Sequence, residues 1–437
     1  MSYPNNRFLR DQILLLDYIV ILSFKVNTSL RVNLWFYTTY DRQEHHKESA
    51  YPLNTNPRNT ICIFSALYPP HIGGVENFTQ ALANELANQG YRVIVVTNNH
   101  DALPNRSYPQ KNIVIYRLPC FSFLDARLPW PKKDAEFRQL MTELENEQID
   151  HICINTRFYP HSLIGAQLAR KKGLVPVVIE HGSDYLTLGN PLIDWGIRRY
   201  EHLITKRLKA YRPKFYAVSK RASEWLNTFG IQSQGEINNA INAQGFRTLR
   251  STRDFRKELG IPESALLVAF VGRVTPEKGI EQLVEAAQLL SGRTDIQFAI
   301  AGDGALRDKL EKRSPSSVHF LGTVSREDLS ALLQEAEVFC LPSRSEGFAT
   351  TLLEAASCGA VPIITNFGGS DEMVPSSEFG VLLPDNKSET IAKALVEAGA
   401  DHERLRARSN KIRLRAEKDY NWQEVAQTLI EALESAD

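Results

Sequence analysis

The sequence predicts an α/β protein in which two Rossmann-like domains, each with a parallel sheet, face each other. Short apolar runs alternate with segments of helical spacing in two successive sets, and Pro/Gly loops join several runs to the helices that follow. A chain of 437 residues also suits two or three domains better than one core. Hydrophobic residues at 43% and charged residues at 23% are typical of globular proteins, and a formal net charge of zero gives no indication of nucleic-acid binding.

The first set begins with an apolar run at residues 58–65, which predicts a buried strand. A Pro/Gly loop follows, and then a helix over residues 76–88 that ends before Gly90. The next strand is expected at residues 91–97. This β-loop-α-β unit is the building block of a parallel, doubly wound sheet. Further strands of this set are expected at residues 113–118, 151–155, 175–180 and 215–219.

The second set starts after a looser stretch at residues 235–252. It contains a helix at residues 279–290 and a final amphipathic helix at residues 421–434, which is expected to cross back to the first domain. Its strands are expected at residues 266–271, 296–301, 318–321, 338–341 and 361–365. The predicted division is therefore an extension at 1–58, domains at 59–240 and 241–419, and a returning helix at 420–437.

The N-terminal extension contains an apolar stretch at residues 13–24 that Asp17 interrupts. This stretch is too short to span a membrane and fits a signal peptide poorly. Residues 41–58 are polar and predict a linker. The extension is either dispensable or a peripheral membrane arm.

The five cysteines are odd in number, widely spaced and free of any Cys-x-x-Cys motif. Such a pattern disfavours both a disulfide framework and a structural zinc site. Reduced thiols in apolar strands are the expected state, which indicates a cytosolic protein.

Ligands of open parallel sheets bind in the loops beyond the carboxyl ends of the strands. The first such loop carries Gly73 and Gly74, whose N–H groups suit a phosphate, although a plain tight turn explains them equally. The loop at residues 271–279 carries Arg273 and Lys278 before a helix. Two cations at that helix end make sense if an anion lies between them, and the alternative is a solvated loop whose charges meet Glu277 or Glu281.

The loop at residues 342–362 gives the strongest signal. If Glu346 opens a helix, Glu354 lies about two turns later on nearly the same face, among apolar neighbours. A carboxylate in such surroundings needs a partner, which the vicinal hydroxyls of a ribose would supply. Glu346, with the N–H groups of Gly347 and Phe348, would then meet a sugar and phosphates, or Glu346 simply complements the helix dipole.

Two further loops follow strands. His181 comes directly after the run at 175–180 and is expected to face the cleft, where it has either a structural or a catalytic role. Gly368, Gly369 and Glu372 follow the run at 361–365 and are expected to line the same cleft.

Taken together, these motifs resemble family 4 of the retaining glycosyltransferases, which adopt the GT-B architecture. The resemblance covers about residues 59–437 and is carried by 272–279, 301–304, 321–323, 346–354 and 368–372 in this order. The segments Gly73–Glu76 and His181–Asp184 are similar to signatures of that family's first domain. One departure lies at residues 239–242, where Asn-Ala-Ile-Asn stands in place of the Asn-Gly-Ile-Asp of many members.

The resemblance implies a donor site for a nucleotide diphosphate sugar, either a UDP- or a GDP-sugar. Arg273 and Lys278 would hold the diphosphate and Glu354 the ribose, whereas Glu346 with the backbone of Gly347 and Phe348 would hold the transferred sugar and phosphate. His181 would contact the donor sugar. The remaining donor-binding positions are Gly73, Gly74, Gly272, Thr323 and Val324.

The implied reaction is transfer to an acceptor hydroxyl of a glycan or a lipid-linked sugar, with retention of configuration, as in the synthesis of cell-surface polysaccharides or glycolipids. No Asp-x-Asp occurs in the chain, so neither a metal ion nor another cofactor is expected. Alternatives are an epimerase or phosphorylase of the same architecture, a non-catalytic subunit, and an NAD-dependent oxidoreductase. The sequence lacks the dinucleotide-binding fingerprint that an NAD-dependent oxidoreductase would carry.

A basic segment at residues 195–214 is either a solvated helix face or a surface for anionic lipid. The second alternative would suit a lipid-linked acceptor at the inner face of a membrane. Its cations are Arg198, Arg199, Lys206, Arg207, Lys209, Arg212 and Lys214.

Overall fold

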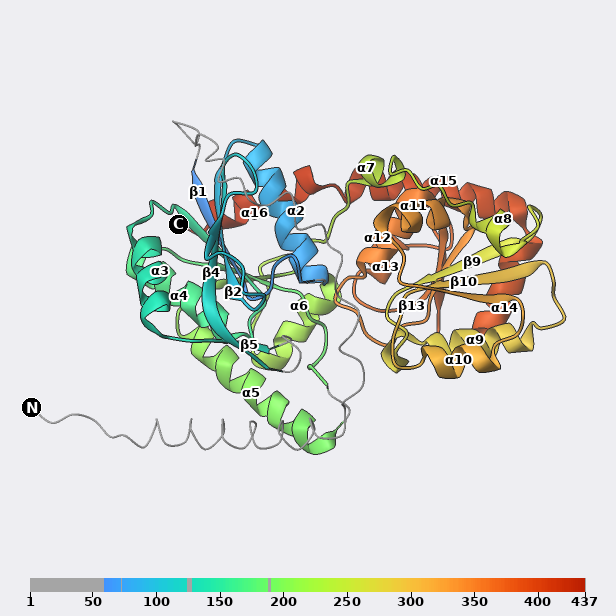
Figure 1. Ribbon diagram of the computed structural model, residues 1–437, viewed down its shortest axis with the longest axis horizontal. Coiled ribbons are helices and arrows are strands. Elements are labelled where there is room, and N and C mark those ends of the chain that lie inside the picture. The colour runs from blue at the N-terminus through green and yellow to red at the C-terminus, as the bar shows by residue number, and fades with distance from the viewer. Residues whose placement is uncertain (1–58, 72, 124–127, 188–189, 437) are drawn as a thin grey trace, which may run out of the picture.

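The computed structural model describes residues 59–71, 73–123, 128–187 and 190–436. Its strands form two separate sheets, which lie in two α/β units side by side (Figure 1). The predictions for residues 1–58 concern a segment outside the described residues.

The first sheet contains eight strands in the order β3-β4-β2-β1-β6-β7-β8, with β5 paired to β4. All neighbours are parallel except β3 and β5, which run antiparallel to β4. The strands are β1 (Thr60–Ser65), β2 (Arg92–Asn99), β3 (Arg106–Ser107), β4 (Ile113–Phe123), β5 (Leu128–Pro131), β6 (His151–Asn155), β7 (Val177–Glu180) and β8 (Lys214–Ala217). The helices of this unit are α2 (Gly74–Asn88), α3 (Ala135–Asn146), α4 (Pro160–Lys172), α5 (Pro191–Lys209) and α6 (Lys220–Leu226).

The second sheet contains six strands in the order β11-β10-β9-β12-β13-β14, and all neighbours are parallel. The strands are β9 (Leu266–Val271), β10 (Ile296–Ala301), β11 (Val318–Gly322), β12 (Val338–Leu341), β13 (Val361–Thr365) and β14 (Val381–Leu383). The helices are α7 (Ala243–Arg247), α8 (Phe255–Leu259), α9 (Ile280–Leu289), α10 (Arg307–Arg313), α11 (Arg326–Glu335), α12 (Thr350–Cys358), α13 (Ser370–Met373), α14 (Ser388–Ala400) and α15 (His402–Asp419).

The strand order explains why the central runs are so apolar. In β1 and β9 every residue is buried, because parallel strands flanked by helices on both faces have no solvated side. In both sheets the order reverses next to the first strand of the set, which is the topological switch point of a doubly wound fold. The loops after β1, β6, β9 and β12 lie at these switch points, and the loop after β7 lies beside them at the same edge of the first sheet.

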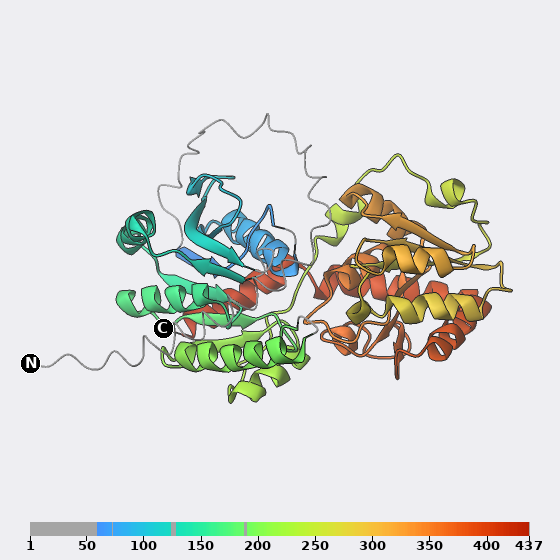
Figure 2. The same ribbon diagram turned by 60° about the horizontal axis from the view of Figure 1, so that its bottom comes forward.

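The last helix, α16 (Trp422–Glu434), crosses back and packs on α2 and β6 of the first unit, as expected. The Trp422 ring lies 5.5 Å from that of Phe78, and the Lys214 ammonium donates to the carbonyl of Ser435. The chain also crosses between the units near Ile241, whose N–H donates to the Tyr420 carbonyl at 2.9 Å. Figure 2 shows the two units from a second side.

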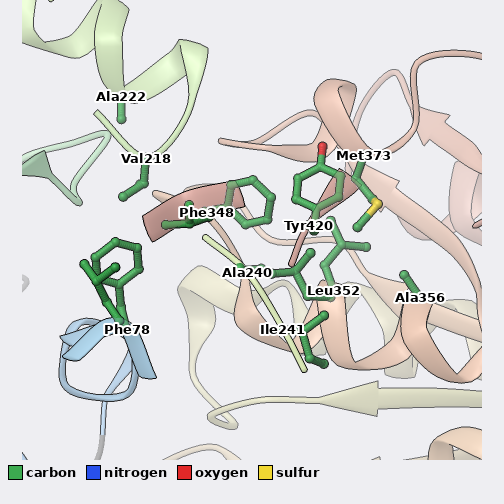
Figure 3. Close-up of a cluster of buried hydrophobic side chains, with 14 of the residues drawn as sticks. Phe78, Val218, Ala222, Ala240, Ile241, Phe348, Leu352, Ala356, Met373 and Tyr420 are labelled. Carbon is green, nitrogen blue, oxygen red and sulfur yellow. The ribbon is translucent and has the colours of Figure 1, made fainter. Parts of the chain in front are cut away.

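A buried apolar cluster joins the two units (Figure 3). From the first unit, Phe78 comes from α2, Ala222 from α6, and Val218 from the segment just before α6. From the second unit, Phe348 comes from the loop before α12 and Leu352 from α12 itself. Figure 3 places the Phe348 ring near Tyr420, and the ring centroids are 5.7 Å apart. The units are therefore packed against each other through side chains of both. Within the part of the chain that the structure describes, no helix is both long and apolar enough to cross a membrane.

Candidate active site

The loop before α12 meets the first unit at the end of β7. Ser183 Oγ donates to the Glu346 carbonyl at 2.6 Å, and Ser219 Oγ donates to the Gly347 carbonyl at 2.9 Å. His181 lies in the same place, because its carbonyl oxygen approaches Gly347. The structure thus brings together three residues that the sequence singled out from distant segments, His181, Glu346 and Gly347.

Glycine at position 347 is required by this close approach. A Cβ on Gly347 would lie well within 3.0 Å of the His181 carbonyl oxygen, closer than real Cβ atoms come. Gly368 is restricted in the same way by the Gly347 carbonyl, and its N–H donates to the Glu346 carbonyl at 3.1 Å. The backbone from 346 to 347 is therefore held on both sides.

Lys278 and Glu346 form an ion pair between Nζ and Oε1. Their side chains are 16% and 13% exposed, so both groups keep some access to solvent. Ser343 Oγ lies 3.1 Å from the same Oε1 and donates to it. Lys278 ends a short 3-10 turn at Pro276–Lys278, and Gly279 beyond it has a φ of +70° and packs on the Pro342 carbonyl. The ammonium is thereby placed at the loop that meets the first unit.

The placement of Arg273 matches the second interpretation of its loop, a solvated cation near Glu277. Its side chain is 59% exposed, and Nη2 lies 3.4 Å from Glu277 Oε1. This exposed pair is weakly held, so the guanidinium is free to turn toward an anion. Lys278 differs because it pairs with Glu346 instead of Glu277 or Glu281.

The expectation that Glu346 opens a helix is wrong. The helix α12 begins at Thr350, after Ala349 in extended conformation, so Glu346 lies in the preceding loop. Two glycine-dependent contacts, at Gly347 and Gly368, hold that loop outside helical geometry. Glu354 lies in the second turn of α12, among the buried side chains of Leu352, Leu353, Ala355 and Ala356.

The Glu354 carboxyl is a half-buried acid without a hydrogen-bond donor among the described residues. Burial raises its pKa to about 7, against the opposing attraction of Arg326. Among the described residues, none donates a hydrogen bond to this carboxylate. The site therefore retains an acceptor group for a hydrogen-bond donor from outside the chain.

His181 is a neutral residue at the junction of the two units. Burial lowers its pKa to about 3. Asn155 Nδ2 donates to Thr79 Oγ1 at 2.8 Å, so Asn155 Oδ1 accepts from His181 Nε2 at 3.0 Å. The edge of the ring also contacts Phe78, with centroids 4.8 Å apart. Such a fixed neutral imidazole can hydrogen-bond a ligand but carries no charge at neutral pH.

Sequence reasoning missed a buried charge cluster behind His181. Arg157 Nε lies 3.0 Å from Glu180 Oε2, and Nη2 lies 2.9 Å from Glu201 Oε2, with all three side chains at most 2% exposed. The other oxygens of the acids accept from the N–H groups of Gly182 (2.9 Å) and Leu186 (3.1 Å). The cluster thus holds the backbone on both sides of the 181–186 loop. Arg157 follows β6 by two residues, so a search of strand ends for cations would have found it.

Gly73 and Gly74 have different surroundings. A Cβ on Gly73 would lie well within 3.0 Å of the Glu76 carboxylate, whereas open space surrounds the Cβ position of Gly74. Glu76 is buried and pairs with His71 Nδ1 at 2.6 Å. The start of α2 thus already holds one carboxylate, and only Gly74 leaves room for a ligand.

The remaining positions lie at strand ends of the second unit. Thr323 is exposed and Val324 half-buried, directly after β11 and before α11. Gly272 has a φ of +155° after β9, and its carbonyl closely approaches Gly302. Glu372, expected in the cleft, lies at the junction but accepts from the Lys220 N–H at 2.6 Å. Its carboxylate therefore ties the two units together.

Two family models match the chain. One, described as glycosyl transferases group 1, matches residues 251–415. The other, described as glycosyltransferase family 4, matches residues 72–243. Together they cover more than half of the chain, one on each unit.

Relatives and solved structures agree with these matches. An uncharacterized glycosyltransferase of Methanocaldococcus jannaschii is 26% identical over 83% of this chain and 95% of its own. The GDP-mannose-dependent alpha-(1-6)-phosphatidylinositol dimannoside mannosyltransferase of Mycobacterium tuberculosis is 25% identical over 84% of this chain and 93% of its own.

Among solved structures, sucrose-phosphate synthase from Thermosynechococcus elongatus has a TM-score of 0.69 at 20% identity, covering 86% of this chain and 99% of its own. Anabaena HepE in complex with UDP and glucose has a TM-score of 0.66 at 17% identity, covering 86% of this chain and all of its own. The fold of the chain is that of these proteins, the GT-B architecture.

Proposed function

The chain belongs to the family 4 glycosyltransferases, and we propose that it moves a sugar from a UDP- or GDP-sugar to an acceptor hydroxyl with retention of configuration. The observation that carries this proposal is the Lys278–Glu346 pair, in which a partly exposed cation contacts the loop where the units meet. The ammonium can exchange its carboxylate partner for a diphosphate, which offers more negative charge.

The donor would lie along the strand ends of the second unit. In this proposal Lys278 and Arg273 hold the diphosphate, and the ribose hydroxyls donate to the Glu354 carboxylate. Thr323, Val324 and Gly272 line the space for the base and the nearby phosphate. A donor so placed would give hydrogen-bond donors to the Glu354 carboxylate, which receives none from the described residues.

The transferred sugar would lie toward the first unit. Glu346 and the N–H groups of Gly347 and Phe348 would face the sugar and phosphate, while neutral His181 would hydrogen-bond a sugar hydroxyl. Gly74, with its open surroundings, gives the acceptor or phosphate room on the opposite side, whereas Gly73 supports the turn.

The proposed reaction is a front-face substitution at the anomeric carbon. The bond from that carbon to the diphosphate oxygen breaks, and the bond to the acceptor oxygen forms on the same face. The acceptor proton passes to the leaving phosphate oxygen, so no protein base is needed. Charge grows on the phosphate in the transition state, where Lys278 and Arg273 stabilise it.

The acceptor is proposed to be a glycan or a lipid-linked sugar, and the chain to act in the cytoplasm at the inner face of a membrane. The mannosyltransferase relative from M. tuberculosis is named for a phosphatidylinositol acceptor, which supports the lipid-linked alternative. Domain closure about residues 236–250 is expected on donor binding. Small-angle scattering curves that do not change with saturating donor would contradict closure.

The test is a turnover assay on a panel of UDP-, GDP- and ADP-sugars, which follows release of the nucleoside diphosphate in excess EDTA. The wild-type chain should release it from one donor, and Lys278→Ala should lose that release. Lys309→Ala, on an exposed pair with Glu281, is the matched control and should keep it.

Loss of activity in EDTA would overturn the metal-independent mechanism, since the sequence offers no Asp-x-Asp but the assay tests the metal directly. No release from any donor, with sugar and lipid-sugar acceptors present, would favour a non-catalytic subunit. Conversion of the donor sugar without release would favour an epimerase.

A further inference from the structure

The outer face of α5 carries a continuous stripe of apolar and basic side chains. We define this outer stripe as Leu192, Trp195, Arg199, Leu203 and Lys206, all exposed. Their spacing of three or four residues places them along one side of a helix. The opposite side packs on the first unit through Glu201, Ile204, Thr205 and Leu208. Figure 1 shows α5 along the lower edge of that unit.

The apolar part of the stripe is unusually exposed. Leu192 is 78%, Trp195 61% and Leu203 39% exposed. They are three of the eight large apolar side chains that are exposed in the described residues, and they share a single helix. Scattered exposed apolar residues are normal, whereas a cluster marks a binding surface.

The charges on this face have one sign. The charged residues of α5 that are exposed are Arg198, Arg199, Lys206 and Lys209, with no carboxylate among them. Lys209 donates to the carbonyls of Phe229 and Gly230 and so is occupied. In the described ranges, no carboxylate pairs with Arg198, Arg199 or Lys206. The two arginines lie instead over aromatic rings, Arg199 at 5.4 Å from Trp195 and Arg198 at 5.1 Å from Tyr185.

We propose that the outer stripe docks the protein on an anionic lipid surface. An indole and leucines on a helix that lies in the interface bury their apolar parts between headgroups and acyl chains. Arginine and lysine on the same face then meet the lipid phosphates, and their long side chains can follow the headgroups. Exposed apolar groups beside charge of one sign match the apolar and the anionic layers of a lipid surface.

The position of α5 connects this surface to the candidate active site. Asn190 caps α5 through the N–H groups of Leu192 and Ile193, and the loop that begins with His181 contacts the helix directly, since the Leu186 N–H donates to Glu201 Oε1 at 3.1 Å. A protein docked through α5 would therefore hold its cleft close to the lipid, where a lipid-linked acceptor is found. This consequence rests on the proposed function, whereas the docking itself does not.

The test is co-sedimentation of the full-length chain with phosphatidylcholine vesicles that contain or lack phosphatidylglycerol. The wild type should bind the anionic vesicles only, and binding should weaken as salt is added. Arg199→Gln with Lys206→Gln should lower the partition coefficient more than about tenfold, since each basic residue near the surface contributes about fivefold. Leu192→Ser with Trp195→Ser should also reduce it strongly.

Matched controls lie on other exposed helix faces. Leu414→Ser, at a side chain 57% exposed on α15, and Lys312→Gln on α10 should leave vesicle binding unchanged. Nucleoside diphosphate release without vesicles should be unchanged in every α5 variant, which also shows that these variants fold.

Three outcomes would overturn the proposal. The first is that the wild type does not bind anionic vesicles, and the second is that it binds neutral vesicles equally well. The third is self-association of the wild type that the α5 variants abolish, because the partner of the stripe would then be a second copy of the chain. The vesicle assay needs no donor. Failure of docking and failure of sugar transfer are therefore observed separately.

Discussion

Two cation–carboxylate groups lie on either side of the junction between the units, and they differ in exposure. In the first unit, Arg157 with Glu180 and Glu201 is sealed, since no side chain exceeds 2% exposure. In the second unit, the Lys278–Glu346 pair keeps 16% and 13% exposure. The first group holds backbone N–H groups around His181, whereas the second lies on a loop whose backbone other residues already hold.

This difference in exposure indicates which of the two cations can bind a ligand. A sealed cation cannot exchange partners, because removing it from its acids leaves two desolvated charges. A partly exposed cation can exchange one carboxylate for an incoming anion at little cost. The sealed group therefore positions the backbone around His181, and the exposed pair is the one that can bind an anionic ligand.

The largest expected effect is on stability at the sealed group. Arg157→Ala should lower the free energy of unfolding by about 3–5 kcal/mol, because Glu180 and Glu201 would remain buried without their cation. Urea denaturation followed by circular dichroism measures this loss. Arg293→Ala, which removes an exposed pair with Asp295, should leave the free energy of unfolding nearly unchanged, because water screens that pair. Equal losses in the two variants would remove the distinction between sealed and exposed charges.

The opposite pattern is expected for the exposed pair. Lys278→Ala should lower kcat about 100-fold or more, because a charge-assisted contact to the leaving phosphate is lost. The same change should cost only about 1 kcal/mol of stability, since water can reach Glu346. If Lys278→Ala unfolds at as low a urea concentration as Arg157→Ala but keeps a normal kcat, Lys278 has a structural role and does not bind the donor.

The loop contact between the units gives the third prediction. Gly347→Ala should lower kcat/KM up to about 100-fold, because the added methyl group displaces the His181 carbonyl and shifts Glu346. Gly74→Ala should leave kcat/KM near that of the wild type in the absence of a ligand contact, since nothing surrounds its Cβ position. If Gly74→Ala loses as much, ligand contact at Gly74 and not loop geometry limits the reaction.

The smallest expected effect concerns Glu354. Its pKa of about 7 in the folded chain exceeds the ordinary 4.5, so the folded state binds more protons between these pH values and its stability falls as pH rises. Glu354→Gln should therefore gain about 1–3 kcal/mol relative to the wild type between pH 4.5 and 8. Urea midpoints across pH measure the gain. Glu263→Gln, at an exposed site, should show none.

The strand prediction succeeded where the physics is local. The central strands are continuous apolar runs, and such runs are readable because both faces of a parallel sheet are buried. The strands β3, β5 and β14 were missed. They have two to four residues at sheet edges, β5 contains two prolines, and pairing with a neighbour alone defines them.

The roles proposed for the site residues stay predictions, but their placement can be compared with the structure. The rule that ligands lie at strand ends selected His181, Lys278 and Glu346, which the structure brings to one junction. The rule did not supply the partners. In the sequence, Glu277 and Glu281 are the acids near Lys278, and only the folded loop brings Glu346 to its ammonium.

The sequence by itself determined the two α/β units, the returning helix and the loops that carry the candidate site. It could do so because apolar periodicity and glycine placement are properties of neighbouring residues. Only the tertiary structure decided that Glu346 stays outside α12 and that Arg157 is buried behind His181. It also decided that some cations of α5 face outward, whereas Lys209 donates to a backbone carbonyl of the first unit. Each of these depends on burial and on contacts between residues far apart in the chain, and desolvation is a property of the folded surroundings.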